Sequence, residues 1–218
     1  IQDVVNDAGH SLGPLASLSG PTIAGELARR KPATMAVASD DPQFAQQIQN
    51  MTTTDWLRIY TNHDLIGVEL AGAGKNVIAI AAGVVDGLAA GFNAKSALLA
   101  RGLAEITRLG VAMDAKPETF FGITGVGDLA TTCFCPEGRN RTCGEYLGKG
   151  MSLEQALEKI PGVVEGVNTT QSLCQLAEQH NVDMPITQAV HRVLFEQLDP
   201  VAAIGQLMTR QPKHEQVG

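Results

Sequence analysis

The stretch NHDLIGVELAGAGKNVIAIAAGVVDGLAAG, residues 62–91, marks a change in the hydrophobic pattern of this 218-residue chain. Before it, short apolar runs alternate with helical stretches, which is typical of an α/β layer. After Asp64 the alternation stops, and long runs with helical periodicity follow one another. The change of period predicts a domain boundary near residues 61–64, between an α/β part and an all-helical part.

The α/β part is expected to contain three strands and two helices. The strands are predicted at residues 15–18, 34–39 and 57–60, and the helices at residues 22–30 and 42–51. Pro42 suits the first turn of the second helix, and Asp40 or Asp41 is available to cap it.

The helical part is expected to contain helices at residues 65–88, 94–109, 117–121, 152–159, 169–180 and 186–195. Gly110 follows the second of these and is expected to end it. Ser152 and Gln155 have the spacing of a capping box at the start of the fourth.

Composition excludes several classes of function. The formal net charge of −7 argues against a nucleic-acid or anionic-membrane surface, because phosphate contacts need a basic field. No membrane span is expected, since the most apolar run, residues 77–92, is shorter than the roughly 20 residues that a span needs and contains Asp86. The four cysteines are too few for a disulfide framework, and the polar first residues do not resemble a secretion signal. We therefore expect reduced thiols and a cytoplasmic protein.

Lys75 is the first candidate for chemistry. On a helix its neighbours three and four residues away are small or apolar, so its ammonium has little obvious access to solvent. One interpretation is a lysine whose stem lies in the core while its head reaches the surface. The other is a general base. Two glycines among the four small residues before Lys75 suggest that a backbone or a ligand approaches closely, and burial disfavours the charged form of a lysine, as a proton acceptor requires.

Two glycine-bearing motifs follow. GITGVGD, residues 122–128, delivers the carboxylate of Asp128 on a tight backbone path. Its glycines resemble a dinucleotide fingerprint, but helical sequence precedes them where that fingerprint needs a strand, so we reject this interpretation and leave open a plain connector. GRNR, residues 138–141, offers the planar fork of Arg139 and the amide of Asn140 to a phosphate or carboxylate, and an ordinary surface arginine pair is the alternative.

No metal site is expected. Cys133, Cys135 and Cys143 match no common zinc spacing, and no histidine lies between them. The scattered histidines have no Ser or Cys partner nearby in the sequence, so a hydrolase triad is not supported.

Lys75, Asp128 and the pair Arg139 and Asn140 occur in the order found in bacterial-type NAD(P)-dependent glycerol-3-phosphate dehydrogenases, and the chain resembles this family nearly end to end. The stretches that carry the resemblance are LSGPTIAGELA, RIYTNHDLIGVELAGAGKNVIAIAAGVVDGL, RGLAEITRLGVAM, GVGDLATTC, GRNR, LGKGMSLEQAL, VVEGVNTTQSL and MPITQAV. The resemblance implies a mainly α fold: an all-helical C-terminal dehydrogenase domain, like that of 6-phosphogluconate dehydrogenase, preceded by the last part of an α/β Rossmann-like domain. It assigns residues 1–62 to the NAD(P)-binding domain and residues 63–218 to the helical substrate-binding and catalytic domain.

The resemblance also implies a reaction and a set of site residues. The family interconverts sn-glycerol 3-phosphate and dihydroxyacetone phosphate by hydride transfer with NAD or NADP, and it supplies phospholipid synthesis. Lys75 falls at the position of the general base. Substrate contacts fall at Gly20, Thr22, Lys75, Asp128, Gly138, Arg139 and Asn140, and cofactor contacts at Ala24, Arg139, Val163 and Glu165.

Three positions depart from the family's pattern. The family usually has Ser where this chain has Thr22 and Gly138, and a larger apolar residue where it has Gly74. Thr22 keeps a hydroxyl, whereas Gly138 loses one and leaves only its backbone N–H to an anion. Gly74 is expected to loosen the helix beside the base.

The family's G-x-G-x-x-G strand-turn-helix and its second substrate-binding lysine do not occur in this sequence, which also has no initiator Met. We expect a fragment or a processed chain that lacks roughly a hundred residues or more, about the size of a cofactor subdomain. Alone, it is expected neither to bind NAD(P) tightly nor to turn over substrate, because the turn that cradles the phosphates is missing.

Two other functions stay open at this point. One is a different two-domain hydroxy-acid dehydrogenase of the same architecture, and the other is a non-catalytic helical dimerisation module. The expected partners are a small-molecule substrate and a second copy of the chain.

Overall fold

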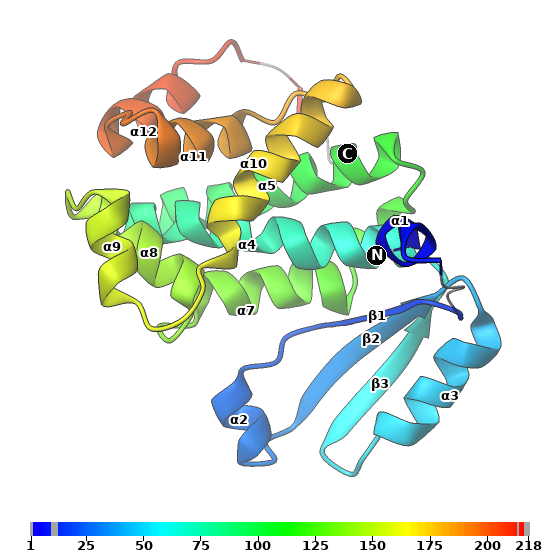
Figure 1. Cartoon of the computed structure of the whole chain (residues 1–218). Helices are drawn as coiled ribbons and strands as arrows, with labels where there is room; N and C mark the ends of the chain where they lie inside the picture. The colour runs from blue at the N-terminus through cyan, green and yellow to red at the C-terminus, as the bar shows by residue number, and fades with distance from the viewer. Residues whose placement is uncertain (1, 10–12, 213, 216–218) are drawn as a thin grey trace.

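A small sheet lies against one end of a helical body in the computed structural model, which describes residues 2–9, 13–212 and 214–215 (Figure 1). The sheet has the order β1 (Ala16–Ser19), β2 (Ala33–Ser39), β3 (Leu57–Asn62). β2 runs parallel to β3, but β1 runs antiparallel to β2. The helix expected at residues 22–30 is only α2 (Ala24–Ala28), and the chain turns back after it at Arg30, whose φ is 54°.

Helix α3 (Pro42–Thr52) covers one face of the sheet. Its apolar side packs Ala45 against Val37 and Ile59 of the neighbouring strands. Asp41 caps the helix as expected, because its Oδ1 accepts from the backbone N–H of Gln43 and Phe44 at 2.9 and 3.2 Å.

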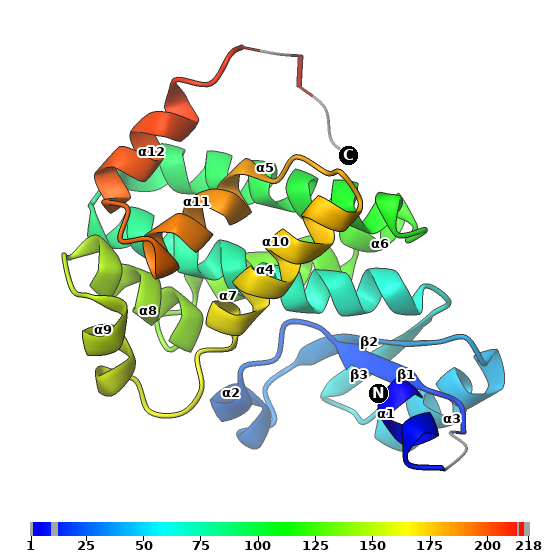
Figure 2. The same cartoon turned by 45° about the horizontal axis from the view of Figure 1, so that its top comes forward.

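The rest of the chain forms the helical body, in which α4 lies at the centre (Figure 2). Its elements are α4 (Leu65–Gly87), α5 (Gly91–Ala112), α6 (Pro117–Phe120), the π-helical turn η1 (Ile123–Gly127), α7 (Asp128–Phe134), α8 (Arg139–Gly148), α9 (Leu153–Lys159), α10 (Glu165–Gln179), α11 (Pro185–Phe195) and α12 (Pro200–Met208). A short helix, α1 (Gln2–Asp7), precedes the sheet. The mainly helical fold class is therefore confirmed, and the capping box of Ser152 and Gln155 at the start of α9 is present.

Helix α4 is buried on all sides. The five consecutive residues 76–80 are each at most 7% exposed, and five residues cover every side of a helix with 3.6 residues per turn. By length and hydropathy α4 is apolar enough to cross a membrane, but 72% of its most apolar window is buried inside the protein. Its apolar character is that of the central helix of a core.

Glycines bring α4 and α8 into backbone contact. A Cβ placed on Gly144 of α8 would lie 1.9 Å from the carbonyl oxygen of Ile80, and one on Gly83 of α4 would lie 1.9 Å from that of Arg141. Both helices carry a second glycine four residues later, Gly87 and Gly148, on the same face. This close packing fixes where α8 begins relative to the middle of α4.

Several elements differ from the sequence-based expectation. Helices α1, α7, α8 and α12 and the turn η1 were not among the predicted elements. Gly110 does not end α5, which continues to Ala112. Its role is steric, because a Cβ at Gly110 would lie 2.2 Å from the ring of Phe120.

Asp64 joins the end of the sheet to the helical body. Its carboxylate accepts from Gly67 N at the start of α4, from Lys116 N and from the Thr119 hydroxyl, at 2.9, 2.9 and 2.7 Å.

We expect Asp64→Ala to lower the free energy of unfolding by about 3 kcal/mol, because two buried donors and a helix end lose their acceptor. Urea unfolding measures the change. Asp199→Ala removes only the cap of α12 and should cost about 1 kcal/mol; equal costs would contradict the linking role of Asp64.

Glu105 of α5 is buried against the start of α11. Its carboxylate accepts from Ile186 N at 2.7 Å and from Thr187 N at 3.1 Å. Burial nevertheless raises the pKa of Glu105 to about 7 from an ordinary value of 4.5, because desolvation outweighs these hydrogen bonds and the nearby Arg108. The folded state therefore binds more protons than the unfolded state between about pH 4.5 and pH 7.

This shift predicts a pH-dependent stability. The contribution of Glu105 is fully present below about pH 4.5 and is lost as the pH rises through about 7, a decrease of about 3 kcal/mol in the free energy of unfolding. Glu105→Gln does not titrate, so the difference in stability between the parent chain and this variant should fall by that amount between pH 4.5 and pH 8. Glu158→Gln, on the exposed side of α9, is the control. Parallel stability curves for the parent and Glu105→Gln would contradict the prediction.

Candidate functional site

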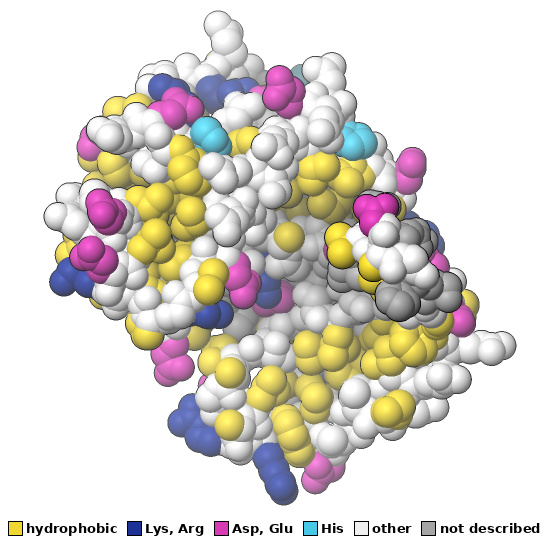
Figure 3. All heavy atoms as spheres, viewed as in Figure 1, with side chains coloured by type: hydrophobic (Ala, Val, Ile, Leu, Met, Phe, Trp, Pro, Cys, Tyr) yellow, Lys and Arg dark blue, Asp and Glu magenta, His cyan; other side chains and the backbone are white. Residues whose placement is uncertain are grey.

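A cavity of about 360 Å³ lies between the start of α2, the middle of α4, α7 and the start of α8. Figure 3 shows basic and acidic side chains meeting in a hollow between the helical body and the sheet. The residues that line the cavity are Thr22, Ile23, Ala24, Gly25, Lys75, Asn76, Asp128, Thr131, Thr132, Cys135, Glu137, Gly138, Arg139, Asn140 and Glu165.

Lys75 and Asp128 form an ion pair in this cavity, between the Lys75 Nζ and Asp128 Oδ2 atoms. The Lys75 side chain is 20% exposed and that of Asp128 only 3%. The Thr132 hydroxyl lies 3.1 Å from Asp128 Oδ1 and 2.7 Å from the Asp128 main-chain oxygen. The Lys75 head group therefore faces a buried carboxylate and is not the unpartnered lysine that its small and apolar neighbours in the sequence suggested.

The π-helical turn η1 delivers Asp128 to the cavity. Gly125 lies at its centre, where a Cβ would be 1.8 Å from the carbonyl oxygen of Phe120, so only glycine fits. Asp128 then occupies the first turn of α7, where it is 2% exposed. The motif read as a possible connector is therefore a wide helical turn that leads directly into α7.

A chain of amide contacts joins α4, α8 and α10 on the other side of the cavity. Asn140 donates from Nδ2 to Asn76 Oδ1 at 3.1 Å and accepts at Oδ1 from Gly166 N at 2.9 Å. Asn76 Nδ2 lies 3.4 Å from Glu165 Oε2. Because both ends of the Asn140 side chain have partners, this residue holds the cavity wall together.

Arg139 opens α8 and extends its guanidinium into the cavity. It lies 3.8 Å from Glu165 Oε1, and both side chains are about half exposed. The preceding residue, Gly138, is the N-cap of α8 and provides no side-chain cap. Its backbone N–H donates to Cys135 O at 3.2 Å, so the expectation that this N–H is left for an anion is wrong.

Eight of the ten residues singled out in the sequence line this one cavity: Thr22, Ala24, Lys75, Asp128, Gly138, Arg139, Asn140 and Glu165. Gly20 and Val163 do not line it. Gly20 shapes the turn before α2, because its carbonyl accepts from the Thr22 hydroxyl at 3.0 Å and a Cβ on it would lie 2.8 Å from Thr34 O. Val163 is 63% exposed.

Seven of the fifteen residues that line the cavity were not among the predicted site residues, and two of them, Thr132 and Asn76, contact predicted ones. Thr132 lies one helical turn after Asp128, a spacing that places the two on the same face and was available as a signal. Asn76 follows Lys75 directly, but its partners come from α8 and α10, far along the chain, and no local pattern indicates them. Gly74 allows α4 and α5 to pack closely, because a Cβ on it would lie 2.9 Å from the Ile106 side chain of α5.

Among the residues that the structure describes, no three His, Cys, Asp or Glu side chains are grouped as a metal site would require. All four cysteines are free thiols. Burial raises the pKa of Cys133 to about 12 and that of Cys143 to about 11, so these two are protonated core residues.

Comparison with known proteins gives consistent matches. Residues 64–205 match the family model of the NAD-dependent glycerol-3-phosphate dehydrogenase C-terminus. The chain is 54% identical over 198 residues to the glycerol-3-phosphate dehydrogenase [NAD(P)+] of Macrococcus caseolyticus (strain JCSC5402), covering 91% of this chain and 60% of the relative. It is 50% identical to glycerol-3-phosphate dehydrogenase [NAD(P)+] 2 of Salinibacter ruber (strain DSM 13855 / M31), covering 58% of that protein.

Solved structures agree with these matches. The crystal structure of glycerol-3-phosphate dehydrogenase from Coxiella burnetii superposes with a TM-score of 0.88 at 42% identity, covering 90% of this chain and 61% of that chain. The enzyme GPD1 of Saccharomyces cerevisiae, at 24% identity and a TM-score of 0.82, shares the fold. The chain thus spans about 60% of the length of these relatives. Since the family model matches well over half of its residues, the chain belongs to the NAD-dependent glycerol-3-phosphate dehydrogenase family, and residues 64–205 are that family's C-terminal part.

Proposed function

We propose that the cavity is the substrate site of an NAD(P)-dependent sn-glycerol-3-phosphate dehydrogenase, and that this chain supplies the substrate side of the full-length enzyme. The observation that carries the proposal is that the Lys75–Asp128 ion pair and the Arg139 guanidinium lie in the walls of one cavity. A cavity of about 360 Å³ suits a small ligand such as a triose phosphate. The two chemical needs of the reaction, a proton donor and an anion binder, are met there together.

The phosphate end of the substrate is proposed to bind at the start of α8. Arg139 offers a planar fork of donors that matches phosphate geometry. Because Gly138 provides no side-chain cap, the first-turn N–H groups and the positive end of the helix dipole remain directed at the cavity. The nearby Glu165 carboxylate holds the guanidinium of Arg139 until the phosphate arrives.

The C2 oxygen is proposed to lie against Lys75. In the reduction of dihydroxyacetone phosphate, the Lys75 ammonium donates a proton to the C2 oxygen, and in the oxidation of sn-glycerol 3-phosphate the amine takes it back. Asp128 stabilises the ammonium and fixes its direction, and its own burial excludes water from that side. NAD(P), when bound, supplies the hydride donor or acceptor.

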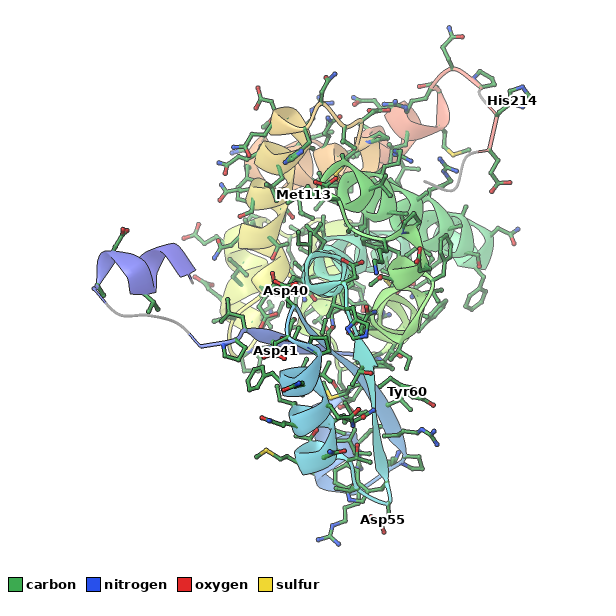
Figure 4. The ribbon with its side chains drawn as sticks, turned by 90° about the vertical axis from the view of Figure 1, so that its right-hand side faces the viewer. Asp40, Asp41, Asp55, Tyr60, Met113 and His214 are labelled. Atoms are coloured by element: carbon green, nitrogen blue, oxygen red, sulfur yellow. The ribbon has the colours of Figure 1, made fainter. Side chains whose placement is uncertain are left out.

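The described residues fit only one edge of a nicotinamide cofactor. Ala24, Arg139 and Glu165 line the cavity, and the exposed Val163 lies before α10. A phosphate cradle would need an uncapped helix start after a parallel strand. The described part of the chain has two such junctions, from β2 to α3 and from β3 to α4, and there Asp41 (Figure 4) and Asp64 themselves cap the helices. We expect calorimetry of the 218-residue chain to show no micromolar binding of NADH; such binding would contradict this assignment.

Replacement of Arg139 tests the proposed function. In the full-length enzyme, Arg139→Ala is expected to raise the KM for sn-glycerol 3-phosphate about a hundredfold, because a charge-assisted, two-pronged contact to phosphate is lost. Arg58→Ala, on the exposed side of β3, is the matched control and should leave the KM unchanged. An unchanged KM in Arg139→Ala would contradict the phosphate role and favour the alternative, a hydroxy-acid dehydrogenase of the same architecture.

The proposal extends to assembly and location. We propose a homodimer, supported by exposed apolar side chains on α12, Val201 and Met208. A cytoplasmic location is supported by the four free thiols. Sedimentation of the full-length enzyme tests the proposed homodimer, and a strict monomer would contradict it.

A purely non-catalytic dimerisation module is disfavoured, because such a module has no need of a Lys–Asp ion pair in a cavity.

A further inference from the structure

A largely buried ionic cluster lies outside the cavity lining, with the Asp86 side chain 23% and the Arg141 side chain 15% exposed, and Arg141 also lies 3.4 Å from Glu145 Oε2. Lys95 of α5 is only 4% exposed, and its Nζ lies 2.7 Å from Asp86 Oδ2. Arg141 Nε, from α8, lies 2.7 Å from the same oxygen. An acid in the last turn of α4 and a lysine near the start of α5 are each at the unfavourable end of a helix dipole, so their presence is explained by the pairing.

The cluster holds both ends of one short segment. At one end, the Lys95 ammonium lies 4.7 Å from the centre of the Phe134 ring, at the end of α7. At the other end, Arg141 is bound to Asp86. Between them, residues 135–140 provide five of the residues that line the cavity, including Arg139. Before α8 begins at Arg139, part of this segment is a turn rather than a helix, closed by the hydrogen bond from Gly138 N to Cys135 O.

We propose that Lys95 and Asp86 are positioning residues for substrate binding, which act by fixing both ends of the cavity wall 135–140 so that Arg139 meets the phosphate. The proposal rests on the proposed function. Neither residue touches the cavity. Their effect is carried through Phe134 and Arg141.

Energetics favour positioning over plain stabilisation. Removing two cations and a carboxylate from water costs free energy that their attraction returns only in part, so a buried ionic cluster is a poor way to stabilise a fold. Fixing one geometry among several is the better supported use of such groups. Binding sites lose affinity when a contact group is displaced by a fraction of an ångström, and the Phe134–Arg141 segment is where such a displacement would reach Arg139.

The test is Lys95→Met in the full-length enzyme, with KM and a calorimetric Kd for sn-glycerol 3-phosphate as readouts. We expect both to rise about tenfold, with kcat changed less than about threefold, because the phosphate binder moves while the Lys75–Asp128 pair stays in place. A merely structural role would reduce the folded fraction, which lowers the maximal rate but leaves KM unchanged. The matched control is Lys159→Met, which removes an exposed ammonium in the last turn of α9 and should leave KM within about twofold.

A second variant keeps the proposal testable if Lys95→Met does not fold. Phe134→Leu alters a half-exposed side chain and removes only the ring face under the ammonium, so KM should rise about threefold. A KM within twofold of the parent in Lys95→Met, or in Phe134→Leu if the former is unfolded, would overturn the proposal. Arg139→Ala distinguishes failure of the proposed function from failure of the positioning role. An unchanged KM in Arg139→Ala would contradict the proposed function. A raised KM in Arg139→Ala together with an unchanged KM in Lys95→Met would contradict only the positioning role.

Discussion

Lys75→Met is expected to lower kcat of the full-length enzyme for dihydroxyacetone phosphate by about a thousandfold, because the variant lacks the amino group that is proposed to give the C2 oxygen its proton. Methionine keeps the length and apolar stem of lysine but has no proton to donate. The KM is expected to change much less, since Arg139 and the start of α8 are untouched. Steady-state kinetics with saturating cofactor measures both values.

The same substitution leaves the Asp128 carboxylate buried without its cation. We therefore also expect the free energy of unfolding to fall by about 3 kcal/mol. Lys31→Met is the matched control, because it removes an exposed lysine that is paired with Glu26 at 2.9 Å, and it should affect neither kinetics nor stability. A kcat within tenfold of the parent in Lys75→Met would contradict the role of Lys75 as the proton donor.

The largest effect on stability is expected from Gly144→Ala. The new Cβ would lie 1.9 Å from Ile80 O, a backbone atom that moves only if α4 or α8 moves. Forcing the two helices apart should lower the free energy of unfolding by about 3 kcal/mol or more, although alanine has the higher helix propensity. Because α8 carries Arg139, the folded remainder should also bind substrate more weakly.

Gly205→Ala in α12 is the matched control for this substitution. A Cβ at Gly205 meets nothing within 4 Å, so only helix propensity acts and stability should rise by up to about 1 kcal/mol. Denaturant unfolding of both variants gives the comparison. A loss smaller than about 1 kcal/mol for Gly144→Ala would show that the α4–α8 contact yields easily and does not fix the cavity wall.

The central helix was predictable from the sequence for a physical reason. Residues 65–88 carry only three charged side chains over more than six turns, and a helix that apolar is stable in water only when other helices surround it. The helix caps at Asp41 and Ser152 were also predictable, because capping depends on residues within three positions of each other. The direction of β1 was not, since the alternation of strands and helices does not tell a short turn-back from a crossover.

Elements that depend on contacts between residues of different helices or turns were not predicted. The π-helical turn η1 depends on Gly125 fitting against Phe120, and the start of α8 depends on glycines that meet Ile80. Helix α12 did carry a local signal, because Asp199 accepts from Ala202 N and Pro200 follows it at the first helical position. The site residues were indicated by family resemblance, whereas the contacts of Asn76 and of Lys95 with other helices emerged only from the fold.

The central claim, that this cavity takes a phosphorylated three-carbon substrate, is tested most directly by comparing two substrates. The measurement is kcat/KM of the full-length enzyme for dihydroxyacetone phosphate and for dihydroxyacetone, with NAD(P)H in excess. We predict a preference for the phosphorylated ketone of about a thousandfold or more, since dihydroxyacetone lacks the phosphate that Arg139 and the start of α8 are proposed to bind. Similar values for the two ketones, or faster reduction of a 3-oxo acid, would contradict the account.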